Sequence, residues 1–542
     1  MCGIWCFVGD SSDISLNISS YVASLLLRGP ESMQIEHVAT NKVVLGFTRL
    51  AINGLENSGM QPMNYGKIHW ICNGEIYNWK DLRDRYNLTC SSESDCSVIG
   101  PLWEHFRDRP DQFFRSLDGV FSIVIVDEKT ENIIIGRDPY GIRPLFQCKT
   151  ARGVAFGSEM KSLSGLGARI KSFKPGSWKR YSAFNTHRIH SIDSNIYHTV
   201  PWLKSIQFSP ICQNGLQFAQ NALRESLTLA VRKRVLTTER PIAALLSGGI
   251  DSSLVASLVQ RELVLAGKGP LETYSIGFKG SPDLYYARMV ADHIGSNHNE
   301  IVVTPEDFFN AIPDVIKAIE SYDITSVRAS VGNWMVCREI AKRSTAKVIF
   351  NGDGADEVFG SYLYFFRAPD DEAFEAETER LLQDIHLYDV LRSDRSISSN
   401  GLEPRTPFLD KQFVAVAKSI ATVWRRPIRD SRCEKWILRS AFSESGLLPD
   451  QVLWRQKEAF SDGVSSGAKS WYQEIQDRVP QGTLSTKVYK WLPPISAESR
   501  YYRDIFDSLY GEHCEQVFPY FWMPKWSGET NDPSARTLSI YK

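Results

Sequence analysis

The sequence predicts a two-domain α/β protein, and three observations lead to that prediction. The chain has 542 residues, more than one hydrophobic core usually organises, so two domains are expected. Its first third contains short strand-like segments separated by turns, whereas strands and helices alternate in the remainder. Between these parts the apolar pattern lapses over 186–215. We therefore predict a first domain at 2–185, a linker at 186–215 and a second domain at 216–542.

The first domain is predicted to be mainly β. Short apolar or alternating runs at 43–47, 68–72, 121–127 and 132–136 have the length and composition typical of strands.

The second domain is predicted to contain a parallel sheet covered by helices. Apolar residues recur at helical spacing over 218–236 and 254–265, and the brief apolar run 243–246 between them reads as a strand. Such alternation is typical of parallel α/β sheets.

Charge and composition exclude several function classes. The chain has 62 basic and 63 acidic residues, so it lacks the basic excess of a nucleic-acid or membrane-surface ligand. No apolar run is long enough to span a bilayer, and the N-terminus does not resemble a secretory signal. The ten cysteines include no CxxC pair, which argues against disulfides and structural zinc. We expect a cytosolic protein that acts on small molecules, without a nucleic-acid or membrane partner.

Cys2 is a candidate nucleophile. Removal of Met1 would place a thiol and a free α-amine on the same residue. An α-amine titrates near neutral pH, so it can accept the thiol proton. This arrangement suits attack on a carboxamide.

Three further segments supply what a glutamine site needs. The run Arg49, Leu50, Ala51 and Ile52 offers a guanidinium for a substrate carboxylate. The Asn73-Gly74-Glu75 segment offers an amide and a backbone N–H for an oxyanion, and Asp95 offers a carboxylate for an ammonium group. Together with Cys2 they predict binding and hydrolysis of L-glutamine.

A phosphate-binding loop is predicted directly after the strand at 243–246. Its two glycines allow close approach of an anion, and backbone N–H groups at a helix start favour phosphate. No lysine follows, so it is not a Walker A loop. Asp251 could bind Mg²⁺ with the phosphates, and Asp356 is the expected second ligand. The loop residues are Ser247, Gly248, Gly249, Ile250, Asp251, Ser252 and Ser253.

These motifs, in this order, closely resemble the glutamine-dependent asparagine synthetases. The resemblance covers nearly the whole chain. It is carried by Cys2-Gly3-Ile4, Arg28-Gly29-Pro30, Arg49-Leu50-Ala51, Asn73-Gly74-Glu75-Ile76-Tyr77-Asn78, SGGIDSS at 247–253, Pro407-Phe408-Leu409-Asp410 and Trp454-Arg455-Gln456-Lys457-Glu458.

The resemblance implies the fold of each domain and the overall reaction. The first domain would be a class II glutamine amidotransferase, an αββα sandwich of the Ntn type. The second would be a pyrophosphatase-loop (PP-loop) domain with an adenine-nucleotide α-hydrolase-like fold. Cys2 would release ammonia from L-glutamine, and ATP with Mg²⁺ would activate L-aspartate as β-aspartyl-AMP. Ammonia would pass through an internal tunnel to give L-asparagine, AMP, pyrophosphate and L-glutamate, and a homodimer is expected.

The resemblance also implies roles for individual residues. Glutamine would be held by Arg49, Leu50, Ala51, Ile52, Glu75 and Asp95, with Asn73 and Gly74 at the oxyanion. ATP would be held by Leu245, Ser247, Gly248, Gly249, Asp251, Ser252, Ser253, Ile276 and Gly352, with Lys457 acting on the phosphates and Asp251 and Asp356 on the metal. Aspartate would be held by Thr325 and Arg328.

The chain departs from the family pattern at 351–357. The family motif there is Ser-Gly-Glu-Gly-Ser-Asp-Glu, whereas this chain has Asp353 in place of the glutamate, and Asn351 and Ala355 in place of the serines. We expect Asp353 to be a shorter but working catalytic carboxylate. Two alternatives remain: a relative that acts on another carboxylate, such as a β-lactam-forming enzyme, and a degenerate homologue with a regulatory or scaffolding role.

Overall fold

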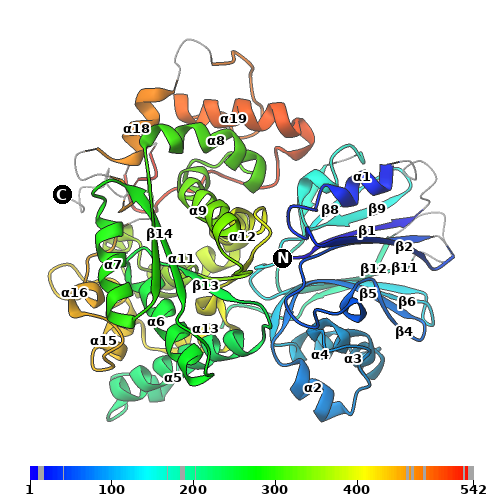
Figure 1. Ribbon diagram of the computed structural model, residues 1–542, viewed down its shortest axis with the longest axis horizontal. Helices are drawn as coiled ribbons and strands as arrows, with labels where there is room; N and C mark the ends of the chain where they lie inside the picture. The colour runs from blue at the N-terminus through cyan, green and yellow to red at the C-terminus, as the bar shows by residue number, and fades with distance from the viewer. Residues whose placement is uncertain are drawn as a thin grey trace.

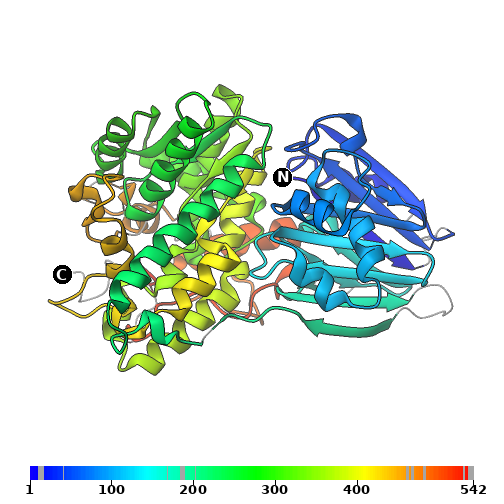
Figure 2. The same cartoon turned by 90° about the horizontal axis from the view of Figure 1, so that it is seen from below.

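The computed structural model describes residues 1–9, 17–40, 42–167, 169–182, 190–201, 203–458, 463–465, 469–479, 484–528 and 532–534. Figures 1 and 2 show two bodies side by side, a β-rich one in blue and cyan and a helix-rich one in green to orange.

The first domain contains two antiparallel sheets of six strands each. The first sheet has the order β10 (Ile170–Ser172), β8 (Phe146–Lys149), β9 (Gly153–Gly157), β1 (Gly3–Gly9), β3 (Val43–Arg49) and β2 (Ser32–Val38). The second sheet has the order β12 (His190–Ile196), β11 (Ser177–Ser182), β7 (Asn132–Arg137), β6 (Gly119–Asp127), β5 (Ile68–Ile76) and β4 (Met63–Tyr65).

Side-chain alternation along these strands produces a four-layer sandwich. Inward residues such as Ile4 and Phe47 of the first sheet pack against Ile71 and Val124 of the second. The outer face of the first sheet is covered by α1 (Ile18–Ala23), and that of the second by α2 (Trp79–Tyr86), α3 (Ile99–Phe106) and α4 (Pro110–Ser116). The expected αββα sandwich is confirmed.

The second domain is built on a five-stranded parallel sheet. Its order is β15 (Asn297–Val303), β14 (Glu272–Phe278), β13 (Ile242–Leu245), β16 (Val348–Phe350) and β17 (Glu403–Arg405). The chain starts in the middle at β13, proceeds outward to β15, and then returns to the other side at β16. The strand order therefore reverses between β13 and β16, where open α/β sheets bind their ligands.

Helices cover both faces of this sheet. Ala244 and Phe350 point toward α5 (Gly215–Leu236), α6 (Ile250–Leu265), α7 (Pro282–Ile294) and α13 (Lys411–Ser419). Ala243 and Ile349 point the other way, toward α8 (Pro305–Ile319), α9 (Ile324–Arg343) and α19 (Ala497–Tyr510). Further helices among the described residues are α10 (Ala355–Phe359), α11 (Asp371–Asp384), α12 (Asp389–Ser398), α14 (Thr422–Arg425), α15 (Trp436–Phe442), α16 (Asp450–Leu453) and α18 (Trp471–Arg478).

The predicted linker is partly wrong. Its residues 190–196 form β12, which pairs with β11 and so belongs to the first domain. The strand lies at the edge of its sheet and residues 191–196 are exposed. An exposed edge strand needs no apolar face, which explains why its polar sequence did not predict a strand. The strands predicted at 43–47, 68–72, 121–127 and 132–136 are confirmed within β3, β5, β6 and β7.

Two hydrophobic clusters cross from one domain to the other. One joins Trp5 of the first sheet to Val327 of α9, and the other joins Leu50 to Leu223 of α5. Within the described residues, no helix combines the length and apolarity that crossing a bilayer requires.

Candidate functional site

Cys2 lies directly before β1, close to the run of candidate glutamine-binding residues. Its Sγ donates a hydrogen bond to the Leu50 carbonyl oxygen at 3.5 Å. Burial raises the pKa of this thiol to about 11. The thiol is therefore protonated near neutral pH in the chain that carries Met1.

Met1 occupies a buried position beside the second domain. Its amine donates to the Leu402 carbonyl oxygen at 3.3 Å, and burial lowers the pKa of this amine to about 5. The amine that the sequence predicts as the base for the thiol thus lies on the preceding residue. Removal of Met1 would bring amine and thiol onto Cys2.

Asn73 and Gly74 lie on β5, facing the start of β1. The Asn73 amide nitrogen donates to Ser158 Oγ at 3.4 Å, and Ser158 Oγ also accepts from Ile4 N at 3.0 Å. Asn73 is fully buried. Its amide is therefore held next to the strand that begins after Cys2.

Glu75 and Asp95 are two buried carboxylates of the same region. Glu75 Oε2 accepts from Asn53 Nδ2 at 2.7 Å, and Asp95 Oδ2 accepts from Ile76 N at 2.7 Å. Burial, together with the neighbouring Asp95 charge, raises the pKa of Glu75 well above its usual value. Burial raises the pKa of Asp95 to about 6. An ammonium group placed between them would favour the ionised form of both.

Arg49 ends β3 and is oriented by main-chain carbonyls. Its guanidinium donates to Gly54 O at 2.6 Å and to Glu56 O at 3.0 Å. The following residues Leu50, Ala51 and Ile52 are buried. The predicted glutamine-site residues thus lie on or directly after β3, on β5 and in the 3₁₀ helix η3 (Asp95–Val98), and Leu50 contacts Cys2 directly.

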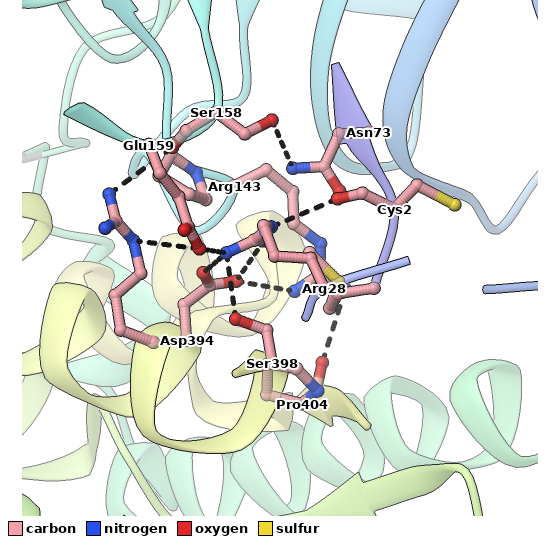
Figure 3. Close-up of polar contacts among 12 residues, drawn as sticks. Cys2, Arg28, Asn73, Arg143, Ser158, Glu159, Asp394, Ser398 and Pro404 are labelled. Atoms are coloured by element: carbon pink, nitrogen blue, oxygen red, sulfur yellow. Dashed lines mark hydrogen bonds and ion pairs between the residues drawn. The ribbon is translucent and has the colours of Figure 1, made fainter. Parts of the chain in front are cut away.

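Arg28 has a role that sequence reasoning did not assign. It is fully buried, and its Nη1 donates to Glu159 of the first domain and to Asp394 and Ser398 of α12, each at 2.8 Å. Its Nε donates to the Cys2 carbonyl oxygen at 3.1 Å. Figure 3 shows this guanidinium between the Cys2 backbone and the second domain. Arg28 thus joins the nucleophile segment to α12.

The second candidate site is a cavity of about 230 Å³ at the carboxyl ends of β13 and β16. Two loops meet there, 247–253 after β13 and 351–357 after β16. Gly248 adopts φ +71°, and a Cβ would lie 2.4 Å from the Tyr286 side chain. A Cβ on Gly352 would lie 2.7 Å from Ser252 N. Gly352 therefore allows the two loops to pack closely together, and Gly248 allows the first loop to pack against α7.

Most of the residues predicted to bind nucleotide, metal or aspartate, or to act in catalysis at the second site, line this cavity. They are Leu245, Ser247, Gly249, Asp251, Ser252, Ile276, Thr325, Gly352, Asp353, Asp356 and Lys457. Gly248 and Ser253 do not line it: Gly248 packs against Tyr286, and Ser253 is fully buried on α6.

Asp251 and Asp356 face each other across a lysine pair. Lys435 Nζ contacts Asp251 Oδ2 and Asp356 Oδ1, both at 2.6 Å, and Lys457 Nζ contacts Asp356 Oδ2 at 2.5 Å. Burial by itself would raise the pKa of Asp356, but the two lysines hold that pKa far below its usual range. Lys435 was missed because a lone lysine far along the chain carries no motif.

The two aspartates fit the expected Mg²⁺ ligation. Both contact the same Lys435 ammonium and therefore lie close together, and Asp251 Oδ1 is buried with no hydrogen-bond partner among the described residues. The described part of the chain contains no cluster of three or more His, Cys, Asp or Glu side chains that could hold a metal by itself. Two carboxylates completed by substrate phosphates is the usual Mg²⁺ arrangement.

The altered loop at 351–357 is anchored by its unusual asparagine. Asn351 Oδ1 accepts from Asp353 N at 3.3 Å, and Asn351 Nδ2 donates to Ser393 Oγ at 2.8 Å. Asp353 Oδ1 accepts from Arg392 Nη2 at 3.4 Å, while its Oδ2 is buried without a partner among the described residues. Burial raises the pKa of Asp353 despite Arg392. The short carboxylate thus keeps one oxygen for a ligand.

Arg328 corrects a sequence-based expectation. It does not line the cavity, because its guanidinium is held in bidentate contacts by Glu498 of α19 at 2.8 and 2.6 Å and by Asp532 at 2.9 Å. Arg392 lines the cavity instead, next to Asp389. A sequence cannot show which arginine a later acidic segment will engage.

Comparison with known proteins agrees with this division into two sites. A family described as the glutamine amidotransferase domain matches residues 1–221. A family described as asparagine synthase matches residues 222–374 and 367–532.

Curated relatives match the chain from end to end. The asparagine synthetase (glutamine-hydrolyzing) of Gallus gallus is 38% identical over 573 residues, which covers 100% of this chain and 99% of the relative. The proteins of the same name from Homo sapiens and Mus musculus are 37% identical over 568 residues and 38% identical over 565 residues, with the same coverage.

Proposed function

The chain belongs to the family of glutamine-hydrolysing asparagine synthetases, and from that premise we infer that its two sites act in sequence. The protein is a ligase that uses ATP to convert L-aspartate into L-asparagine, with L-glutamine as the amide donor.

In the first site, Cys2 would be the nucleophile. With Met1 removed, its α-amine takes the thiol proton, and the sulfur attacks the glutamine carboxamide carbon. The Asn73 amide and the Gly74 N–H would stabilise the oxyanion. Ammonia leaves, and water then hydrolyses the γ-glutamyl thioester to L-glutamate.

The substrate's charged groups would be held by buried partners. The Arg49 guanidinium is already oriented by two carbonyls and suits the α-carboxylate. Glu75 and Asp95 suit the α-ammonium, and Leu50, Ala51 and Ile52 would form the wall beside Cys2.

In the second site, ATP would lie across the ends of β13 and β14. Leu245 and Ile276 would contact the adenine, and Ser247, Gly249, Ser252 and the start of α6 would contact the phosphates. The aspartate β-carboxylate would attack the α-phosphorus and displace pyrophosphate, giving β-aspartyl-AMP.

Mg²⁺ would be held by Asp251 and Asp356, where it would offset negative charge on the phosphates. Lys457 contacts both aspartates, at 2.5 Å to Asp356 and 3.9 Å to Asp251, so its ammonium would neutralise the departing pyrophosphate.

Asp353 would act where ammonia meets the activated aspartate. Its Oδ2, which has no hydrogen-bond partner among the described residues, would accept a proton as ammonia attacks the β-carbonyl carbon and AMP leaves. Thr325 would contact aspartate, and Arg392 offers a guanidinium for a substrate carboxylate in place of Arg328. Ammonia would travel from Cys2 to this point through the interior between the domains.

One observation carries the proposal for the second site: the loops after β13 and β16 meet at the point where the strand order reverses, and both line the same cavity. The proposal further includes a homodimer and a cytosolic location, which rest on the resemblance alone.

The test separates the two half-reactions. Purified protein is supplied with L-aspartate and Mg-ATP, and with either L-glutamine or ammonium chloride, while pyrophosphate, AMP and asparagine are quantified. We expect equal amounts of the three products from both nitrogen donors. Glutamine hydrolysis without pyrophosphate from either donor would leave only the first half of the proposal standing.

A further inference from the structure

The edge strand β17 of the second domain lies against the candidate glutamine site. Leu402, directly before it, accepts from the Met1 amine, and Pro404 O accepts from Arg143 of the first domain at 3.3 Å. Figure 3 shows Pro404 and Arg143 beside the Cys2 segment. Arg405, the last residue of β17, extends this contact to Glu75 of the candidate glutamine site.

Arg405 is fully buried and its guanidinium spans both domains. Within the second domain it donates to Glu403 Oε1 at 2.7 Å, and to the Thr237 hydroxyl and carbonyl oxygens at 3.2 Å each. Toward the first domain, its Nη2 lies 3.3 Å from Glu75 Oε2. The carboxylate proposed to hold the glutamine ammonium is therefore paired with a cation from the other domain.

The same segment of the second domain also holds the other partner of Glu75. Asn53 Nδ2 donates both to Glu75 Oε2 at 2.7 Å and to Thr237 O at 3.1 Å. Arg405 and Asn53 thus both donate to the Thr237 carbonyl oxygen, and both also contact Glu75 Oε2.

The residues after Thr237 contact the predicted glutamine-binding run 49–52 of the first domain. Glu239 N donates to Ile52 O at 3.0 Å, and Arg240 Nε donates to Ala51 O at 2.8 Å. The glutamine-binding run therefore takes part of its shape from the second domain.

We propose that Arg405 is a positioning residue of the glutamine site, which holds the Glu75 carboxylate in place to receive the substrate's α-ammonium group. The inference rests on the proposed role of Glu75 in glutamine binding. It also means that the second domain completes the first domain's site.

Electrostatics give Arg405 a second effect on Glu75. The groups facing Glu75 are Asp95, Glu403, Arg405 and Arg143. Burial and the two acidic neighbours favour the protonated form of Glu75, whereas the two arginines oppose it. Loss of Arg405 would therefore shift ionisation of Glu75 to higher pH, and a neutral carboxyl attracts an ammonium less.

Arg405 also touches the other site through its backbone. Its carbonyl oxygen accepts from Asn351 N at 3.2 Å, at the start of the Asp353 loop. A side-chain substitution leaves this bond available, so it can weaken glutamine binding while the ammonia-dependent reaction continues.

The decisive variant is Arg405→Gln. We expect KM for glutamine in the glutaminase reaction to rise about tenfold or more, since a charged hydrogen-bond partner is lost, with kcat changed by less than about threefold. The acid limb of kcat/KM against pH should move to higher pH. Ammonia-dependent asparagine synthesis should stay within about twofold of the original chain.

A matched pair of lysine variants separates positioning from general packing. The Arg234 and Arg405 guanidiniums both lie over the Tyr77 ring, at 4.6 and 5.4 Å from its centroid. Arg234 forms an ion pair with Asp410, whereas Arg405 forms ion pairs with Glu75 and Glu403. We expect Arg405→Lys to raise KM for glutamine less than Arg405→Gln does, and Arg234→Lys to leave it unchanged.

Equal loss of glutaminase and ammonia-dependent synthesis in both Arg405 variants would assign Arg405 a structural role and overturn the inference. Unchanged KM in Arg405→Gln would overturn it as well. Failure of the underlying glutamine site would look different, because glutamine hydrolysis would then survive Cys2→Ala in the otherwise unaltered chain.

Discussion

The two sites of this protein treat buried carboxylates in opposite ways. In the glutamine site, Glu75 and Asp95 each accept a hydrogen bond from the protein. In the nucleotide cavity, Asp251 and Asp353 each keep a buried oxygen that has no partner in the described parts of the chain. A buried acceptor without a partner in the protein is costly and remains open to a bound ligand, ion or water. Under the proposed function, the first site would be preorganised for a small zwitterion, and the second would be completed by a cation and substrate.

The pKa values of the carboxylates also differ between the two sites. The carboxylates of the glutamine site have raised pKa values because burial outweighs their partners. Asp356 in the cavity has a strongly lowered pKa because Lys435 and Lys457 outweigh its burial. Under the proposed function, an anionic nucleotide would therefore meet two lysines, whereas a cationic ammonium would meet two carboxylates.

The largest expected effect is that of Cys2→Ala, which should disable the glutamine site and leave the nucleotide site active. Removal of the nucleophile should lower glutamine-dependent synthesis by about 10⁴-fold or more, while ammonia-dependent synthesis continues. Coupled assays with each nitrogen donor measure both. Substantial glutamine-dependent activity in this variant would contradict the assignment of Cys2.

Arg28→Met tests how much the buried ion pairs between the two domains contribute to the stability of the protein. Loss of this buried cation leaves Asp394 and Glu159 without one partner, so we expect destabilisation of about 3–5 kcal/mol. Urea unfolding followed by fluorescence measures the shift. Arg240→Met is the matched control, since Arg240 also bridges the domains to Glu31 but is partly exposed; its loss should cost less than about 1 kcal/mol. Equal effects of the two variants would contradict the assigned importance of the buried pair.

Asp353→Ala addresses the nucleotide side alone. We expect ammonia-dependent synthesis to fall about a hundredfold, with glutaminase activity unchanged, because Asp353 lies in the second cavity. Asp353→Glu restores the family's side-chain length and should retain activity. If Asp353→Ala made asparagine at the original rate, no catalytic role could be given to this carboxylate.

The pH dependence of glutamine hydrolysis gives the smallest expected effect. Burial raises the pKa of Asp95 to about 6, and its carboxylate form is the one that attracts the substrate ammonium. The kcat/KM for glutamine should therefore fall by about tenfold per pH unit below this value.

Ionisation of Asp95 should lower the free energy of unfolding, although the same ionisation favours glutamine binding. Because the folded pKa of Asp95 exceeds the unfolded value near about 4, ionisation of Asp95 costs stability as pH rises through that window. Asp95→Asn should thus bind glutamine more weakly but unfold at a higher urea concentration at pH 7. A lower unfolding midpoint for this variant would contradict the pKa assignment.

Much of the fold could be predicted from the sequence because its local signals are strong. The runs at 43–47 and 121–127 form strands within β3 and β6, and the run at 254–265 lies in α6. The strand β12 escaped prediction since an exposed edge strand carries no apolar alternation. The boundary of the first domain was misplaced for that reason.

The sequence by itself determined which chemical groups are present: a cysteine after Met1, a glycine-rich phosphate loop, and the aspartates at 251, 353 and 356. Short motifs identify such groups because neighbouring residues form one local structure. The tertiary structure alone decided which distant groups pair. It placed Lys435 between two aspartates, withdrew Arg328 from the cavity, and brought Arg405 to Glu75. Pairing between charges far apart in the chain depends on how the domains pack, and no local pattern encodes it.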